Sequence, residues 1–257
     1  MHRVIFTIFG FPVYTYGVML VTGFITGIFF SIKRNRSKSI TTDDIMDLSL
    51  YLLLGGLVGA RLVYVLLHFS EYMANPISII NLREGGLAWH GALLGGLLAF
   101  LLFSKKRKID FAELVDLCSP GIVLGLAIGR LGCFMNGCCL GDPTTLPWGV
   151  VFPDAGPMKR HPTQLYELIL DLLVVLFLVN REKHKKFNGE IALLMMSAYS
   201  LVRFFVEFFR FSPPRIAGLS IAQYLSLLMA AVTAICVVRM RARSAAPPSK
   251  PPQKKGA

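Results

Sequence analysis

The sequence has little charge, since only 16% of its 257 residues are Asp, Glu, Lys or Arg. Soluble domains carry about 25% charged residues, so this shortage argues against a soluble globular protein. Acidic residues are the scarcer kind, with 15 Asp and Glu against 27 Lys and Arg. A net charge of +12 would suggest nucleic-acid binding in a soluble protein, but here the basic residues cluster between long apolar stretches. We therefore expect a membrane protein with no nucleic-acid partner.

Cysteine is also scarce, and the five cysteines form no paired CxxC motifs. Their odd number excludes a complete set of intramolecular disulfides. Cys133, Cys138 and Cys139 are close in sequence, but a thiolate site with three cysteines needs a fourth ligand, and this spacing is not that of a zinc site. We expect no metal and no cofactor. Packed, reduced thiols are the default, and a disulfide within the cluster remains open.

Hydrophobic residues are abundant: they make up 54% of the sequence, and the mean hydropathy is +0.59. A membrane span needs about 20 apolar residues. Seven segments approach that length, at residues 14–32, 45–68, 87–103, 111–131, 162–179, 191–209 and 219–238. They predict an all-α polytopic membrane protein of about seven transmembrane helices. The start of the chain contains no segment typical of a cleaved signal peptide, so we expect the first apolar helix to be retained.

The distribution of Lys and Arg predicts how the chain crosses the membrane. Most of the basic residues follow the first, third, fifth and seventh apolar segments, in the clusters 33–38, 105–108, 181–186 and 239–243 and in the tail. By the positive-inside rule the amino terminus lies outside and the carboxyl terminus in the cytoplasm. We expect a membrane domain over residues 1–244 and a disordered cytoplasmic tail over 245–257, which is rich in Pro and Lys.

Several polar side chains lie within or at the ends of these apolar segments. An arginine at the centre of a membrane helix costs at least ~2.5 kcal/mol, so such groups face the bundle interior or a cavity. They are Arg61, His90, Asp116, Arg130, Gln164, Glu167, Asp171, Arg203 and Glu207. Arg203 and Glu207 are four residues apart and are expected to pair on one helix face. Arg210 could compete for Glu207, which would leave a lone arginine, and Arg61 is a possible partner for Asp116 or Asp171.

The segment Gly129–Gly141 places Arg130 in glycine-rich sequence directly after an apolar run. Two interpretations stay open: a turn that binds an anion, and an interfacial turn with an arginine that reaches toward water. His90 begins the third apolar segment, and a histidine can accept a proton near neutral pH. A structural histidine is the commoner case, although the neighbouring Gly85, Gly86 and Gly91 favour a site.

Five pieces of sequence resemble the prolipoprotein diacylglyceryl transferase family of bacterial inner-membrane enzymes. They are Tyr16-Gly17, Glu84–Gly91, Gly129–Gly141, Arg160–Glu167 and Tyr199–Arg210. Two positions depart from the family's glycine-arginine signature, which usually has asparagine where this chain has Cys133 and glutamate where it has Cys138. The connection between Gly141 and His161 also looks short for the family.

The resemblance implies seven spans and an enzyme that moves the diacylglyceryl group of phosphatidylglycerol onto a thiol. The acceptor is the lipobox cysteine of a prolipoprotein signal peptide. The reaction forms a thioether and releases glycerol phosphate. It implies catalytic roles for His90, Arg130 and Arg203, because fixed guanidinium groups suit a phosphate leaving group. Substrate contacts are expected from Arg130 and from further residues of the motifs. These are Tyr16, Gly85, Gly86, Asn136, Gly141, Tyr199 and Glu207.

Rival functions remain open at this point. A lipid-binding relative without catalysis, or with a changed acceptor, would follow if Cys133 and Cys138 have removed activity. A transporter could use the intramembrane charges as a relay, but the sequence contains no evident inverted repeat. A thiol-based redox protein would depend on the cysteine cluster alone.

Overall fold

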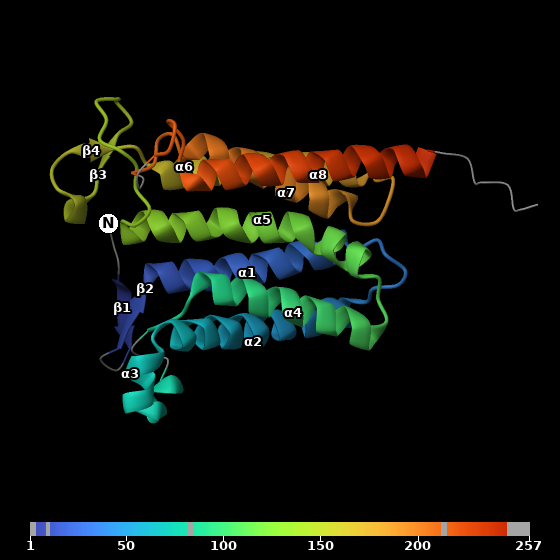
Figure 1. Cartoon of the computed structure of the whole chain (residues 1–257), viewed down its shortest axis with the longest axis horizontal. Coiled ribbons are helices and arrows are strands. Elements are labelled where there is room, and N and C mark those ends of the chain that lie inside the picture. The colour runs from blue at the N-terminus through green and yellow to red at the C-terminus, as the bar shows by residue number, and fades with distance from the viewer. Residues whose placement is uncertain (1–3, 9–10, 82–84, 212–214, 246–257) are drawn as a thin grey trace, which may run out of the picture. The chain divides into compact units, whose positions relative to one another are not determined.

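Helices dominate the computed structural model, which describes residues 4–8, 11–81, 85–211 and 215–245 (Figure 1). Glu84 of the second motif and residues 246–257, most of the expected tail, lie outside these ranges. The α-helices are α1 (Thr15–Arg34), α2 (Thr42–Leu67), α3 (Phe69–Ala74), α4 (Trp89–Arg107), α5 (Phe111–Asn136), α6 (Thr163–Glu182), α7 (Glu190–Val206) and α8 (Ile221–Ala245).

Five of these helices, α1, α2, α5, α6 and α8, are long and apolar enough to cross a membrane. This confirms the prediction of a polytopic α-helical membrane protein. The other two expected spans form as helices but have less apolar length. Helix α4 carries Lys105, Lys106 and Arg107 in its last turn, and α7 has only 17 residues. The count of seven spans therefore stays a prediction.

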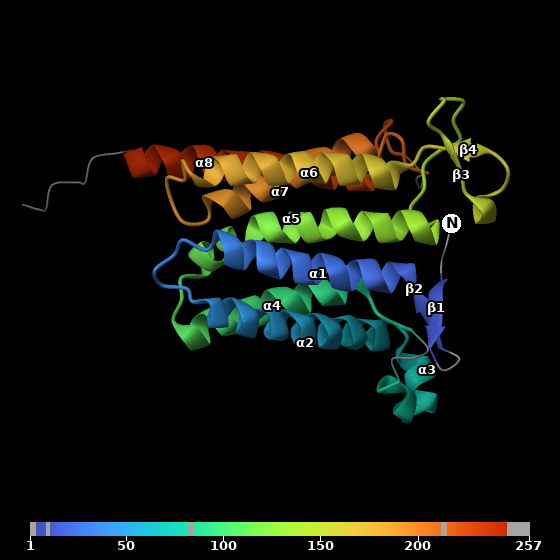
Figure 2. The ribbon, with the colours of Figure 1, turned by 180° about the vertical axis from the view of Figure 1, so that it is seen from behind.

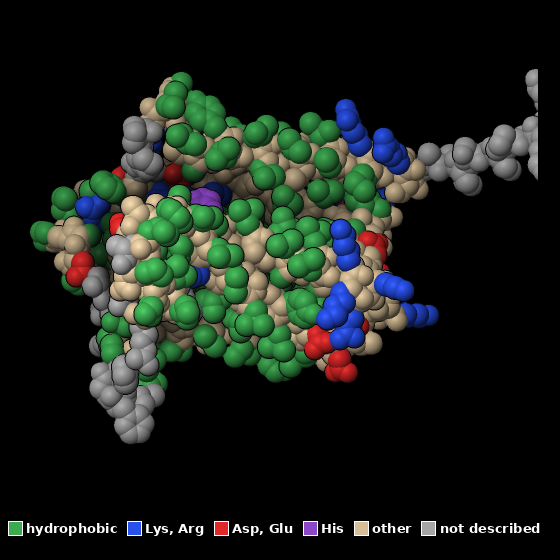
Figure 3. All heavy atoms as spheres, turned by 60° about the horizontal axis from the view of Figure 1, so that its bottom comes forward, with side chains coloured by type: hydrophobic (Ala, Val, Ile, Leu, Met, Phe, Trp, Pro, Cys, Tyr) green, Lys and Arg blue, Asp and Glu red, His purple; other side chains and the backbone are tan. Residues whose placement is uncertain are grey.

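Burial along α6 is the reverse of that in a water-soluble helix. Gln164, Glu167 and Asp171 are buried, whereas Leu173 and Leu176 are more than half exposed. Hydrophobic side chains likewise cover the sides of the helices on the face seen in Figure 3, and Lys and Arg gather near helix ends. Apolar surface of this extent is stable only against lipid, so the exposed leucines mark the membrane-facing surface.

Short strands and helices, which the sequence reading did not predict, connect the long helices. Strands β1 (Val4–Ile8) and β2 (Phe11–Tyr14) form an antiparallel hairpin before α1. Strands β3 (Val150–Val151) and β4 (Lys159–Arg160) form a second hairpin between α5 and α6. The short 3-10 helices η1 (Pro76–Ile79) and η2 (Pro153–Ala155) follow α3 and β3. The all-α class therefore holds for the membrane segments but not for every connection.

The chain divides into two compact units. One comprises Phe24–Gly121, and the other comprises residues 1–23 and 122–257. In the first unit α2 and α4 lie side by side in Figures 1 and 2. Glycines allow this approach, because a Cβ on Gly91 or Gly95 would overlap the carbonyl oxygen of Gly59 or Gly55. Small residues at close helix crossings are typical of membrane proteins.

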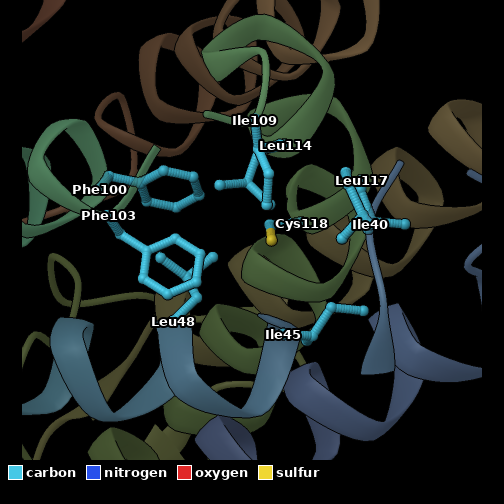
Figure 4. Close-up of a cluster of buried hydrophobic side chains, with 9 residues drawn as sticks. All are labelled: Ile40, Ile45, Leu48, Phe100, Phe103, Ile109, Leu114, Leu117 and Cys118. Carbon is cyan, nitrogen blue, oxygen red and sulfur yellow. The ribbon is translucent and has the colours of Figure 1, made fainter. Parts of the chain in front are cut away.

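An apolar cluster joins the ends of α2, α4 and α5 within this first unit (Figure 4). Its fully buried members include Leu48, Phe103 and Leu114. Helix α2 begins at a capping box, in which the Thr41 hydroxyl accepts a hydrogen bond from the Asp44 amide and the Asp44 carboxylate accepts one from the Thr41 amide. The cap satisfies amides that helix geometry leaves unpaired and so fixes where α2 starts.

Arg61 of α2 organises the segment that precedes α4. Its five N–H groups donate to carbonyl oxygens at 2.6–2.9 Å, and the acceptors belong to Ser78, Ile79, Asn81, Gly85 and Gly86. A guanidinium has five donors, so all of them are used here. Arg61 is thus bound to backbone carbonyls, and the expectation of a carboxylate partner in Asp116 or Asp171 is replaced by this loop anchor.

Candidate functional site

The carboxylate of Glu167 lies at the centre of a charge cluster in the second unit. Its Oε2 pairs with Nε of Arg130, and its Oε1 lies 2.9 Å from Nη1 of Arg203 and 3.7 Å from Nη1 of Arg210. Arg203 also pairs with Glu207 at 2.7 Å, and the Glu207 carboxylate accepts a hydrogen bond from the Ser220 hydroxyl. Three cations and two carboxylates therefore share one site.

Helix geometry explains how these side chains meet. Arg203 and Glu207 are four residues apart, so the pair predicted from their spacing is confirmed. Arg130 comes from α5 and Glu167 from α6, and no sequence spacing links them. The Glu167 side chain is 4% exposed, against 17–23% for Arg130, Arg203 and Arg210. A carboxylate this deeply buried must be paired, and each guanidinium keeps one edge accessible.

The structure corrects the expected surroundings of Arg130. The apolar segment was expected to end at Leu131, with Arg130 in a glycine-rich turn over Gly129–Gly141. Arg130 instead lies inside α5, which continues to Asn136. Arg130 is also paired with Glu167, so it is not the lone cation that the sequence suggested. Arg203 and Arg210 likewise contact Glu167. Any anion bound here would therefore share these arginines with carboxylates that are already present.

The chain after α5 is held against the ends of α6 and α7. The Gly141 amide donates to the His161 carbonyl at 3.0 Å, and the Asp142 amide donates to Phe209. Gly141 forms an isolated antiparallel bridge with Arg210. A Cβ on Gly141 would overlap the Phe209 carbonyl and lie 2.7 Å from the His161 Cβ. Only glycine fits between the backbone at His161 and the backbone at Phe209. This explains why position 141, which bridges Arg210, is a glycine.

Three other predicted site residues, Tyr16, Asn136 and Tyr199, belong to the same unit as the cluster. Tyr16 packs at Gly132, where a Cβ would lie 3.3 Å from the Tyr16 Cα. Tyr199 lies on α7 one turn before Arg203, near enough to Arg130 and Glu167 to interact with them electrostatically. Asn136 is the last residue of α5. The structure thus brings Tyr199 to the charge cluster and places Tyr16 against the same helix as Arg130.

The remaining predicted residues belong to the first unit. His90 lies in the first turn of α4 and its side chain is exposed. The centroid of its ring lies 5.1 Å from that of the Trp89 ring. Gly85 and Gly86 have φ values of 82° and 81°, a region that favours glycine, and both carbonyls accept from Arg61. The role of these three residues in a site stays a prediction.

Two cavities belong to the same unit as the charge cluster, and the first is lined in part by one of its arginines. One of about 270 Å³ lies between α7 and α8, and Tyr199, Arg203 and Met229 are among its lining residues. The other, of about 370 Å³, is lined by Trp148, Tyr166 and Phe209 among others. Both are predominantly apolar, so each suits an acyl chain or another apolar segment, and the first would place it beside Arg203.

Glu167 and Arg210 were absent from the predicted catalytic and binding residues. Glu167 was named as a polar group in an apolar segment, and Arg210 as a possible partner of Glu207. Their signal was a carboxylate and an arginine at the ends of apolar helices, which indicates a buried partner without naming it. Asp171 lies one turn beyond Glu167, fully buried, and neither carboxylate oxygen has a hydrogen-bond partner among the described residues.

The sequence profile of the family described as prolipoprotein diacylglyceryl transferase matches residues 3–239. The chain belongs to this family. The proteins it resembles include phosphatidylglycerol–prolipoprotein diacylglyceryl transferases of two bacteria. The Clostridioides difficile protein is 38% identical over 228 residues, 89% of this chain and 91% of the relative. The Bordetella bronchiseptica protein is 40% identical over 229 residues, 84% of this chain and 87% of the relative. The family resemblance seen in five sequence motifs is confirmed over nearly the whole chain.

Proposed function

We propose that this chain transfers the diacylglyceryl group of phosphatidylglycerol to the cysteine thiol of a prolipoprotein lipobox. Membership of the transferase family supports the reaction class. The convergence of Arg130, Arg203 and Arg210 on one buried carboxylate is the observation that carries the proposal for this molecule. A phosphate that enters the site would find three guanidinium groups held in place before it binds, which lowers the cost of organising them.

The proposed reaction forms one bond and breaks one. The thiol sulfur bonds to the glycerol carbon of the lipid, the bond from that carbon to the phosphate oxygen breaks, and glycerol phosphate leaves with the electron pair. The thiol proton needs an acceptor, because only the thiolate is strongly nucleophilic. We assign this step to His90, and headgroup contacts to Tyr16, Asn136, Gly141, Tyr199 and Glu207, with Gly85 and Gly86 giving room for close approach.

The fold proposed for this function has seven spans in a bacterial inner membrane, with the amino terminus outside and the carboxyl terminus in the cytoplasm. The basic clusters at the ends of α1, α4 and α8 support this orientation. The apolar cavity beside Arg203 would hold an acyl chain while the headgroup meets the charges.

Replacing Arg130 tests the proposal. Loss of a fixed donor to the leaving phosphate should lower the transfer rate by about 10²–10³-fold in Arg130→Gln. The assay uses purified protein, phosphatidylglycerol and a lipobox peptide, and Arg36→Gln, which changes an exposed arginine, is the matched control. Undiminished transfer in correctly inserted Arg130→Gln would contradict the assigned role.

One alternative has a specific observation in its favour. Cys133 and Cys138 stand where the family signature usually has an amide and a carboxylate, and their presence favours a relative that binds lipid without transferring it. That protein would bind anionic lipid and yield no modified peptide in the same assay.

A further inference from the structure

The three cysteines near the end of α5 converge, a feature that the transfer mechanism does not use. The Sγ atoms of Cys133, Cys138 and Cys139 all lie within 4.8 Å of one another. All three are free thiols. A metal site needs at least three Cys, His, Asp or Glu ligand atoms close together. Among the described residues, these three cysteines are the group that meets this condition.

The backbone around these thiols is held in a conformation that directs them to one point. Gly137 and Cys139 have φ values of 72° and 61°, in the left-handed region. The Cys138 amide donates to the Cys133 carbonyl at 3.2 Å, which closes the turn after α5. A non-glycine residue rarely adopts this region because its Cβ is crowded there, so surrounding contacts must hold Cys139 in place.

Two buried side chains of α6 supply those contacts. The Gln164 amide donates to the Cys138 carbonyl at 2.6 Å, and the Thr163 hydroxyl donates to the Cys139 carbonyl at 2.7 Å. Both side chains belong to residues that are 1% exposed. The backbone that carries the Cys138 and Cys139 side chains is therefore held by buried residues of α6, as a preformed ligand set requires.

The geometry matches the needs of a soft metal ion. A zinc–thiolate bond is about 2.3 Å long, which puts sulfur atoms around one ion ~3.8–4.0 Å apart, within reach of the observed cluster. Thiolates select zinc and its softer relatives over magnesium or calcium. The cluster also lies at the carboxyl end of α5, where the helix dipole favours a cation.

We propose that Cys133, Cys138 and Cys139 bind one thiophilic divalent ion of the zinc–cadmium class, with a fourth position open to an external ligand. Binding converts three thiols to thiolates and releases three protons, so a site with a divalent ion carries one negative charge. Arg130 lies one helical turn before Cys133 and offsets that charge. The external fourth ligand removes the need for another cysteine or histidine.

Cadmium titration of the purified, reduced full-length protein tests the site without reference to transferase activity. We expect a thiolate-to-cadmium absorption band that saturates at one ion per chain, with three protons released and three thiols protected from a thiol reagent. Cadmium should also displace zinc from the zinc-loaded protein, because thiolates bind the softer ion more tightly.

Single substitutions identify the ligands. Cys138→Ser or Cys139→Ser should weaken cadmium binding by more than the ~10–100-fold that loss of an outer-shell partner costs. Cys236→Ser, which changes a cysteine of α8 outside the cluster, should leave it unchanged. The proposal is overturned if the wild-type protein shows no such band, or if the band is equally strong in the cluster variants. It is also overturned if two cluster thiols form a disulfide and their reduction restores no cadmium binding.

Discussion

At the scale of single residues, Glu167 balances more charge than any neighbour described here. Its carboxylate contacts Arg130, Arg203 and Arg210, and its side chain is 4% exposed. Removing one partner of a buried ion pair leaves uncompensated charge in a region of low dielectric constant. Glu167 therefore stabilises the fold and also holds the arginines where the proposed phosphate would bind.

We predict that Glu167→Gln lowers the free energy of unfolding by about 3–5 kcal/mol, because three arginines lose their shared counter-charge. Thermal unfolding in detergent measures the change, and the transfer rate should fall with it. Glu71→Gln, at an exposed position of α3, is the control. Equal stability of Glu167→Gln and wild type would show that the cluster does not need this carboxylate.

A second residue-scale prediction concerns Gly141. Its Cβ would overlap the Phe209 carbonyl, so Gly141→Ala must separate the loop from the segment that follows α7. We expect a loss of stability of about 1–3 kcal/mol and a lower transfer rate. In Gly129→Ala the new methyl group meets only a Leu20 side-chain atom at 3.7 Å, so this variant should behave as wild type. Similar behaviour of the two variants would argue against the tight fit at Gly141.

What the sequence could predict differs among these residues for a physical reason. The pair Arg203–Glu207 follows from helical periodicity within one segment, and it was predicted correctly. The pair Arg130–Glu167 joins two helices, and its partners depend on packing that no local pattern encodes. The polarity of Glu167 in an apolar helix predicted that it had a partner, but not which one.

At the scale of elements, the contact between α2 and α4 depends on glycine. A Cβ on Gly95 would overlap the Gly55 carbonyl, whereas a Cβ on the adjacent Gly96 would meet nothing within 4 Å. In a membrane, helices associate through close packing and not through the hydrophobic effect, so this surface is sensitive to a single methyl group.

Gly95→Ala should therefore separate α2 from α4 and destabilise the protein by about 1–3 kcal/mol. Gly96→Ala differs by one position and should be neutral or stabilising by about 0.4–1 kcal/mol, since alanine restricts the unfolded chain. Unfolding temperatures of the two variants measure the contrast. If Gly96→Ala is as unstable as Gly95→Ala, the loss of stability does not come from the close packing of Gly95 against α2.

The elements themselves were largely predictable, because long apolar runs in a membrane must satisfy their own backbone hydrogen bonds and so become helices. Helix α5 continued past the predicted end at Leu131 for the same reason, since its glycines do not interrupt that bonding. The hairpins β1–β2 and β3–β4 were missed because strands of two to five residues leave little periodicity to detect.

At the scale of the whole molecule, the number of spans decides which side each connection faces. If α4 and α7 cross the membrane with the others, residue Lys108 lies in the cytoplasm and Ala155 lies outside. If only the five longer helices cross from the same starting side, both positions reverse. The two arrangements therefore differ at sites that a reporter can distinguish.

We predict that alkaline phosphatase fused after Lys108 is inactive and that the same reporter fused after Ala155 is active, since the enzyme folds only outside the cytoplasm. Green fluorescent protein at the same sites should give the opposite pattern. The reverse result at both positions would contradict seven spans with the amino terminus outside, and with that terminus outside it would remove α4 from the membrane.

The most direct test of the account is the transfer reaction of the wild-type protein. Purified protein, phosphatidylglycerol with labelled acyl chains and a peptide with one lipobox cysteine are incubated together, and the peptide mass and released glycerol phosphate are measured. We predict a peptide heavier by one diacylglyceryl group, with an equal amount of glycerol phosphate, and no product from a Cys→Ser peptide. An unmodified peptide in the presence of folded, lipid-binding protein would contradict transferase activity and favour the lipid-binding relative.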